Sequence, residues 1–206
     1  MTSEYHDLWQ RQRELQLEAA TVSGDLQLDD LLARLGEPVP VGSVALGLMV
    51  WRDLDITVVC PSLDVAAAIG AAAHFATHAR VWQVQFRNDT GSFNTDPAYP
   101  DGLYIGLRYR TPDNHDWKVD IWFVDEPERQ PDLAHLDSIP PRLTQDAREA
   151  ILRIKGAWFD RREYGSIVSS HDIYTAVLEH GVSTVRQFDD WRKRSANPAA
   201  STEISD

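Results

Sequence analysis

The sequence predicts an α+β fold in which a mixed or antiparallel β-sheet is flanked by helices and followed by a C-terminal helical unit. Strand-like segments cluster in the middle of the chain and helical segments lie on both sides of them. A stretch rich in proline and acidic residues, Asp125 to Pro141, separates the strands from the last helices. We therefore expect an N-terminal helix over 1–26, a central α+β domain over 27–126, a helical unit over 142–194 and a disordered tail over 195–206.

Composition limits the possible functions of the chain. Its 206 residues are 43% hydrophobic and 25% charged, which is typical of a soluble globular protein. We expect a cytoplasmic protein, because Cys60 is a lone cysteine and no secretory pattern follows Met1. We also expect no membrane span, because the apolar stretches are far shorter than about 20 residues. Twenty Lys and Arg against 32 Asp and Glu give a net charge of −12, which disfavours nucleic acid and favours a neutral or cationic small partner.

The N-terminal part predicts two helices and then an extended segment. Leucines in loosely helical spacing predict a helix from Ser3 to Ala20, which Ser23 to Asp25 interrupt. A shorter amphipathic helix follows from Leu28 to Leu35 and ends at Gly36. Prolines just after it predict an extended chain.

The remaining elements follow from period-2 and period-3.6 patterns. A strand over Asp53 to Cys60 is followed by an alanine-rich helix over Leu63 to His78. Further strands are predicted over Arg80–Arg87, Leu103–Tyr109 and Trp117–Val124, and further helices over Leu143–Tyr164, Ser170–His180 and Thr184–Arg194.

Three acidic residues on strands carry the strongest chemical signal. Side chains alternate along a strand, so Asp53 and Asp55 project from one face while Leu54 and Ile56 pack on the other. Asp120 likewise faces out of the later strand. Carboxylates that converge repel one another unless they share a proton or hold a divalent cation, and Mg²⁺ prefers oxygen ligands. If the two strands are neighbours, the three acids form one metal site.

These residues, together with Gly42-Ser43 in VPVGSVALGL, resemble the motifs of the nucleotidyltransferase superfamily, which includes DNA polymerase beta and the aminoglycoside and lincosamide nucleotidyltransferases. The resemblance extends from about Leu28 to Val124 and implies a nucleotidyltransferase-type sheet. It implies that Gly42 and Ser43 bind nucleotide phosphates and that Asp53, Asp55 and Asp120 are catalytic and bind Mg²⁺. This chain has Leu46 and Arg52 where many members have a basic residue and a serine.

The resemblance implies an enzyme that moves a nucleoside monophosphate from an NTP such as ATP to a hydroxyl, releasing pyrophosphate. We expect a small hydroxylated acceptor, such as an aminoglycoside-like or lincosamide-like antibiotic. Two alternatives remain open: a protein or tRNA acceptor, and a non-catalytic module that only binds nucleotide.

A few other residues have possible roles in binding. Arg52, Lys118 and Lys155 could each meet a phosphate or an acidic neighbour. Trp122, beside Asp120 on the same strand face, is the best candidate for stacking on a base or an antibiotic ring, although core packing is the simpler interpretation.

Overall fold

The computed structural model describes residues 3–196, which form two compact units. Gln12–Pro140 form one, which we call the sheet unit, and the described residues on either side of it form the other, the helical unit. Helix α1 (Ser3–Asp25) begins in the helical unit and continues into the sheet unit. Positions 1–2 and 197–206, which include most of the predicted tail, lie outside the described residues.

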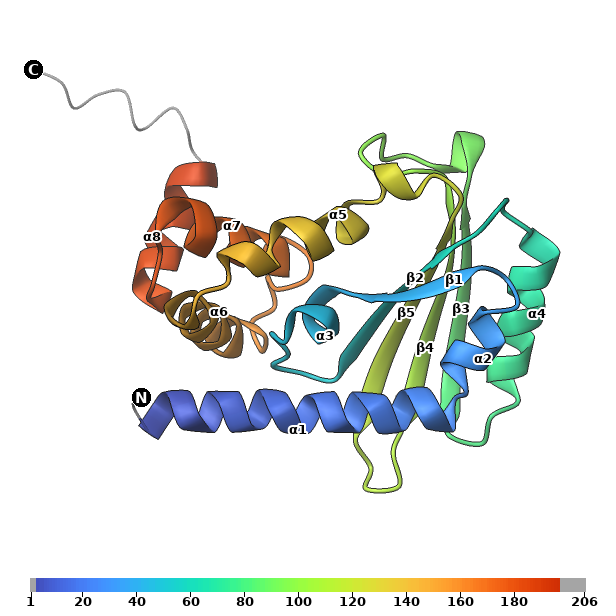
Figure 1. Ribbon diagram of the computed structural model, residues 1–206, viewed down its shortest axis with the longest axis horizontal. Helices are drawn as coiled ribbons and strands as arrows, with labels where there is room; N and C mark the ends of the chain where they lie inside the picture. The colour runs from blue at the N-terminus through green and yellow to red at the C-terminus, as the bar shows by residue number, and fades with distance from the viewer. Residues whose placement is uncertain (1–2, 197–206) are drawn as a thin grey trace, which may run out of the picture. The chain divides into compact units, whose positions relative to one another are not determined.

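The sheet unit contains five strands in the order β1-β2-β5-β4-β3 (Figure 1). The strands are β1 (Glu37–Val41), β2 (Asp53–Val59), β3 (Val81–Asp89), β4 (Gly102–Arg110) and β5 (Asp116–Val124). The pairing of β2 with β5 is parallel and the others are antiparallel, so the sheet is mixed, as predicted. The extended segment with Pro38 and Pro40 is β1, an edge strand, where prolines leave the sheet's hydrogen bonds intact.

One face of the sheet builds the core. The apolar residues that alternate along the strands, such as Ile56, Ile105 and Ile121, form one cluster with side chains from α1, α2 (Leu28–Leu32) and α4 (Val65–Ala76). Asp64 fixes the start of α4 by accepting a hydrogen bond from the Ala67 amide at 3.0 Å. The polar alternating residues are therefore on the opposite face.

The predicted end of the first helix is wrong, because α1 passes through Ser23 and Gly24 to Asp25. Val22 and Leu26 are 1% and 3% exposed, and burying such side chains outweighs the roughly 1 kcal/mol that a glycine costs within a helix. The helix ends where Gln27 adopts a left-handed conformation, with φ 52°.

Short helices replace the predicted linker between the strands and the last helices. These are η2 (Pro127–Arg129), α5 (Pro131–Ser138) and η3 (Pro140–Arg142), with η1 (Gly91–Phe93) in the loop after β3. Proline is favourable in the first turn of a helix, and it occupies that position in α5. The prolines therefore begin helical turns here rather than preventing them.

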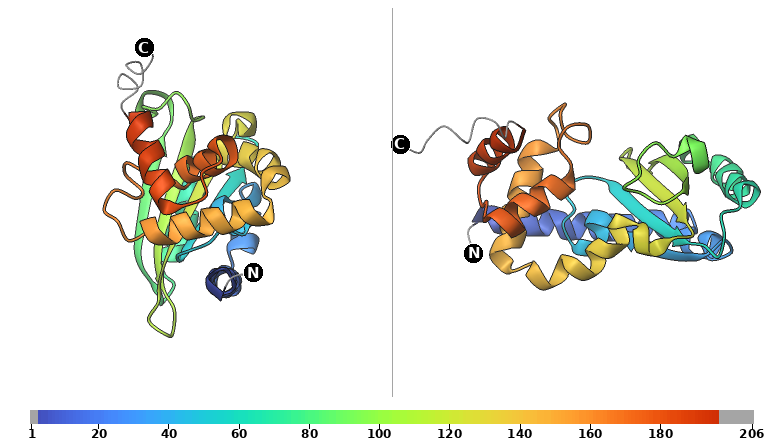
Figure 2. Two further views of the ribbon diagram at one scale, coloured as in Figure 1. Left: turned by 90° about the vertical axis from the view of Figure 1, so that its left-hand side faces the viewer. Right: turned by 90° about the horizontal axis from the view of Figure 1, so that it is seen from above.

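The helical unit contains α6 (Gln145–Trp158), α7 (Ser170–His180) and α8 (Val185–Ala196), which Figure 2 shows gathered together. Helix α7 begins at a capping box in which Ser169 and Asp172 exchange hydrogen bonds, which explains the predicted start at Ser170. Trp158 and Phe188 pack edge to face in its core with ring centroids 5.5 Å apart. None of the described helices is long and apolar enough to cross a membrane.

Candidate active site

Three carboxylates meet on the polar face of the sheet. Asp55 on β2 is the direct partner of Asp120 in the parallel pairing with β5, and Asp53 lies two residues earlier on β2. Because residues two apart share a face, all three side chains project to the same side. One oxygen from each lies within 4.8 Å of the other two, and the side chains of Asp53 and Asp120 are only 14% exposed. We call these three residues the acidic triad.

The Gly42-Ser43 pair lies directly beside the triad. Val41, the last residue of β1, pairs with Asp55, and the chain then turns into α3 (Gly42–Leu46). Gly42 has φ +63°, and a Cβ at this position would lie 2.6 Å from Asp55 Oδ2. Only glycine satisfies both the left-handed backbone and the close approach of the carboxylate. Ser43, the next residue, is buried.

The triad concentrates negative charge in a partly enclosed site. Burial raises the pKa of Asp55 well above its usual range, and the neighbouring carboxylates of Asp53 and Asp120 raise it further. Lys118 opposes this charge, since its ammonium contacts Asp120 and lies 3.8 Å from Asp53 Oδ1. Burial alone would lower the pKa of Lys118, but the attraction of Asp53 and Asp120 raises it overall.

A tyrosine from the neighbouring strand fixes Asp120 from the other side. Tyr104 on β4 donates a hydrogen bond of 2.7 Å to Asp120 Oδ1. A Cβ at Gly106, the β4 partner of Asp120, would lie 2.4 Å from the Tyr104 hydroxyl, so the absence of a side chain there makes the contact possible. Burial, followed by the hydrogen bond to Asp120, raises the pKa of Tyr104 to about 12. Tyr104 therefore stays protonated and able to donate at neutral pH.

An aromatic cluster borders the same face. The Trp122 ring lies 5.1 Å from that of Tyr104, and the Arg87 guanidinium lies 4.9 Å from the Tyr104 centroid and 5.2 Å from that of Trp122. These distances are typical of cation–π contacts. Trp122 is partly buried and lies on the same side of the sheet as the triad, away from the core.

The donor set of the triad fits a hard divalent cation. Three carboxylates within reach of one another supply the oxygen ligands that Mg²⁺ favours, while leaving coordination positions for water or phosphate. Among the described residues, this is the one group of three or more potential ligands close enough together to hold a metal ion.

The other predicted binding residues have different roles. Arg52 donates to Glu18 of α1 through Nε at 2.7 Å and Nη2 at 3.1 Å. Lys155 is buried in the helical unit, 1% exposed, and its Nζ lies 3.3 Å from the Tyr174 hydroxyl. Sequence reasoning missed Tyr104 and Gly106, because no motif marks them and their role depends on how β4 pairs with β5.

Comparisons with known proteins identify the fold. No protein-family model matches the chain, and no curated protein matches it. Among solved structures, a mutant of the Cid1 poly(U) polymerase bound to MgATP aligns over 86% of this chain and 55% of its own, with 18% identity and a TM-score of 0.57. Cid1 with the UTP analogue UMPNPP aligns over 84% and 53%, with 18% identity and a TM-score of 0.55. A cytoplasmic RNA terminal U-transferase aligns over 81% and 46%, with 19% identity and a TM-score of 0.54.

The chain spans about half the length of these solved structures. At 18–19% identity the likeness concerns the fold, and these terminal uridylyltransferases are members of the superfamily that the sequence motifs resemble. The structure agrees with that assignment. Its mixed sheet is flanked by helices, and three acidic residues on two adjacent strands lie beside a Gly-Ser turn. The chain therefore has the fold of the nucleotidyltransferase superfamily.

Proposed function

We propose that this chain is a metal-dependent nucleotidyltransferase, which transfers a nucleoside monophosphate from an NTP to an acceptor hydroxyl and releases pyrophosphate. One observation carries the proposal: three carboxylates from two neighbouring strands converge beside the Gly42-Ser43 turn. In phosphoryl and nucleotidyl transfer, positioning and charge neutralisation account for most of the catalysis, and this arrangement can supply both.

Each site residue has a proposed role. Asp53, Asp55 and Asp120 would hold Mg²⁺, which would neutralise the negative charge of the triphosphate. Ser43 and the backbone around Gly42 would bind the phosphates. Asp120 is also placed to accept the proton of the acceptor hydroxyl, and the hydrogen bond from Tyr104 holds its carboxylate in one orientation.

We propose the 3′-hydroxyl of an RNA as the first candidate acceptor. The structures with the same fold include an RNA terminal U-transferase and a Cid1 complex with the short product ApU, which supports this choice over the small acceptor expected from the sequence. The partly exposed Trp122, Tyr104 and Arg87 give the sheet face groups on which a base could stack. The net charge of −12 favours the second candidate, a neutral or cationic small molecule with a free hydroxyl.

A direct test supplies the protein with Mg²⁺, each of the four NTPs labelled at the α-phosphate, and one acceptor at a time. The acceptors are a single-stranded RNA, the same RNA with a 3′-deoxy end, and a panel of aminoglycosides and lincosamides. We expect label to join the RNA that has a free 3′-hydroxyl, with release of pyrophosphate, and the 3′-deoxy RNA to remain unlabelled. Label on a small molecule alone would favour the second candidate.

Two variants separate catalysis from binding. Asp120→Asn should abolish transfer, whereas Asp137→Asn, which removes an exposed carboxylate of α5, should retain it. Absence of transfer to every acceptor, combined with calorimetric binding of nucleotide that Asp120→Asn leaves unchanged, would contradict the proposal and favour a module that only binds nucleotide.

A further inference from the structure

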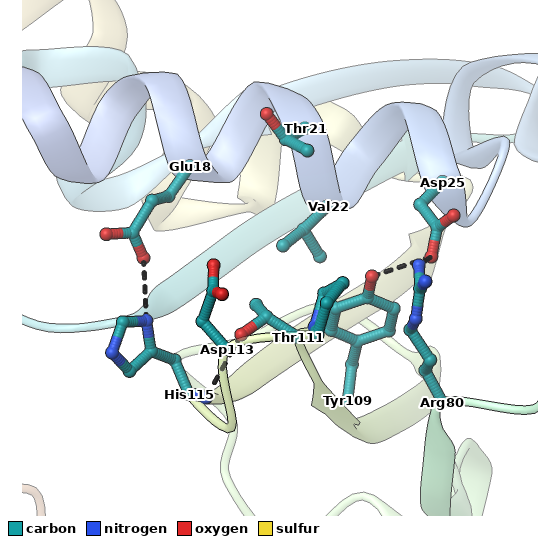
Figure 3. A pocket seen from close by; sticks show the side chains of 10 residues that line it. Glu18, Thr21, Val22, Asp25, Arg80, Tyr109, Thr111, Asp113 and His115 are labelled. Atoms are coloured by element: carbon teal, nitrogen blue, oxygen red, sulfur yellow. Dashed lines mark hydrogen bonds and ion pairs between the residues drawn. The ribbon is translucent and has the colours of Figure 1, made fainter.

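The polar face of the sheet extends from the triad across β4 to the edge strand β3, and its far part has no role in the transfer proposed above. Arg108 of β4 lies between Lys118 of β5 and Gln83 of β3. Tyr109, the next residue of β4, points to the opposite face, where its hydroxyl donates to Asp25 at 2.6 Å (Figure 3). Because side chains alternate along a strand, Arg108 projects to the same face as the triad.

Exposed side chains of β3 and β4 form this part of the face. Gln85 pairs with Gly106, which in turn pairs with Asp120. The register of β3 shifts at Trp82, which is 55% exposed and lies on this same face, with Arg110 Cζ 5.9 Å from the centroid of its indole ring. We call the four exposed residues the β3–β4 patch: Trp82, Gln83, Gln85 and Arg108.

Arg108 is the cation on this face of β3, β4 and β5 that no carboxylate binds within the described residues. The other three each contact a carboxylate: Lys118 those of Asp53 and Asp120, Arg110 that of Asp116, and Arg87 that of Asp89. The hydrogen bond from Arg110 is the main cause of the lowered pKa of Asp116, to which Arg108 contributes least. The side chains of Gln83 and Gln85 also make no hydrogen bond within residues 3–196. The patch therefore combines one positive charge with two free amides and contains no acid.

The patch and the Gly42-Ser43 turn lie on opposite sides of the triad. The turn follows β1 and approaches Asp55, whereas Arg108 is the diagonal neighbour of Asp120 on β4, a relation that separates side chains by about 7–8 Å. In nucleotidyl transfer the attacking and leaving oxygens lie roughly in line. If the triphosphate is bound at the turn, the acceptor must therefore approach over β4 and β3.

The chemistry of the patch suits a single-stranded nucleic acid. The planar guanidinium of Arg108 matches a phosphate group, and the exposed ring of Trp82 offers a surface on which a base can stack. Arg110, beside Trp82, is four residues along β4 from Gly106, which is about 14 Å. Stacked bases repeat about every 3.4 Å, so this length accommodates several nucleotides. The net charge of −12 opposes contact with a longer polyanion.

We propose that the β3–β4 patch binds the last few nucleotides of a single-stranded RNA acceptor, with Arg108 on a backbone phosphate and Trp82 stacked on a base. The 3′-hydroxyl then lies beside Asp120, and the strand runs from there toward the edge of the sheet. This inference rests on the proposed nucleotidyl transfer and gives it an acceptor surface. Because the patch binds RNA without touching the reacting groups, it sets the affinity for the acceptor.

Fluorescence anisotropy of a labelled 15-nucleotide single-stranded RNA, with Mg²⁺ and without NTP, measures this binding separately from transfer. We expect saturable binding by the full chain. Arg108→Gln should raise Kd by about five- to tenfold and lower the slope of log K against log salt by about 0.7, because one phosphate contact is lost. Arg108→Lys keeps the charge and should keep the salt slope. Trp82→Ala should raise Kd by about tenfold, because a stacking surface is lost.

A matched control and a kinetic measurement make the test specific. Arg34 is an exposed arginine after α2, which packs on the opposite face, so Arg34→Gln should leave Kd within about twofold. In the transfer assay Arg108→Gln should raise the KM for RNA and leave the KM for NTP within about twofold. Transfer to RNA with Kd unchanged in Arg108→Gln or Trp82→Ala would overturn this inference and leave the proposed transfer standing. A raised KM for NTP, equal losses in Arg34→Gln, or no RNA binding by a chain that labels small molecules would overturn it too.

Discussion

Replacing Asp55 with asparagine should stabilise the metal-free protein while removing one ligand of the proposed metal site. The three ligand oxygens lie within 4.8 Å of one another, and at an effective dielectric of 20 two unit charges at that distance repel by about 3.5 kcal/mol. Asp55 experiences two such repulsions, from Asp53 and Asp120, a weaker one from Asp132, and one opposing attraction from Lys118. Because Lys118 and any proton held at the raised pKa offset part of this repulsion, we expect the variant to gain about 1–3 kcal/mol at pH 8.

The stability that Asp55→Asn gains over the wild type should increase as the pH rises. The pKa of Asp55 in the folded protein lies above the ordinary value of an aspartate carboxyl group, so the folded state holds this proton more tightly than the unfolded state. The wild-type protein therefore loses stability as the pH rises from about 4 through the folded pKa, and Asp55→Asn should remove this loss.

Thermal unfolding in EDTA between pH 5 and pH 8 measures the stability difference between the variant and the wild type, and its dependence on pH. For a chain of this size the expected gain raises Tm by roughly 2–12 °C at pH 8, with a smaller difference at pH 5. Mg²⁺ should raise Tm of the wild type and have little effect on the variant. Asp137→Asn serves as the control and should match the wild type. A variant that is less stable than the wild type at pH 8, or that keeps its pH slope, would refute the reasoning.

Three other substitutions or treatments test single contacts. Gly42→Ala should destabilise the protein by about 1–3 kcal/mol in urea unfolding, because φ +63° and the Asp55 carboxylate both oppose a Cβ; unchanged stability would contradict this account. Tyr104→Phe should lower kcat by about tenfold through loss of the hydrogen bond to Asp120 while altering the KM for NTP by less than twofold; the reverse pattern would assign Tyr104 to nucleotide binding. Cys60, buried and with its pKa raised to about 11 chiefly by burial, should resist iodoacetamide at pH 8 until the protein is unfolded, as mass spectrometry can show; rapid labelling of the folded protein would be inconsistent with that burial.

Local patterns predict much of the sheet unit. The alternation along β2 and β5 predicts both strands and the facing of Asp53, Asp55 and Asp120, because the period of a strand is fixed by its geometry. The parallel pairing of these strands depends on how β3 and β4 complete the sheet, and the sequence patterns therefore leave it open.

Features that depend on tertiary contacts cannot be predicted from local sequence patterns. The hydrogen bond between Tyr104 and Asp120 requires the β4–β5 register, and the space at Gly106 has meaning only within it. Trp82 alternates with polar residues as a buried residue would, yet it is 55% exposed, because the register of β3 shifts between Val81 and Gln83. The continuation of α1 likewise depends on a core that Val22 and Leu26 help to build.

The alternation of side chains along β5 also bears on how this protein can diverge. Asp113 and Asp120 belong to one hairpin, but Asp113 is in its turn and Asp120 is inside a paired strand. Descendants of this chain can lengthen or reshape the turn while the paired residues keep their partners. A one-residue insertion after Asp116 would instead shift Val119 to the position opposite Asp55 and direct Asp120 into the apolar interior. Natural insertions and deletions should therefore be abundant at the tip of this hairpin and almost absent within β5.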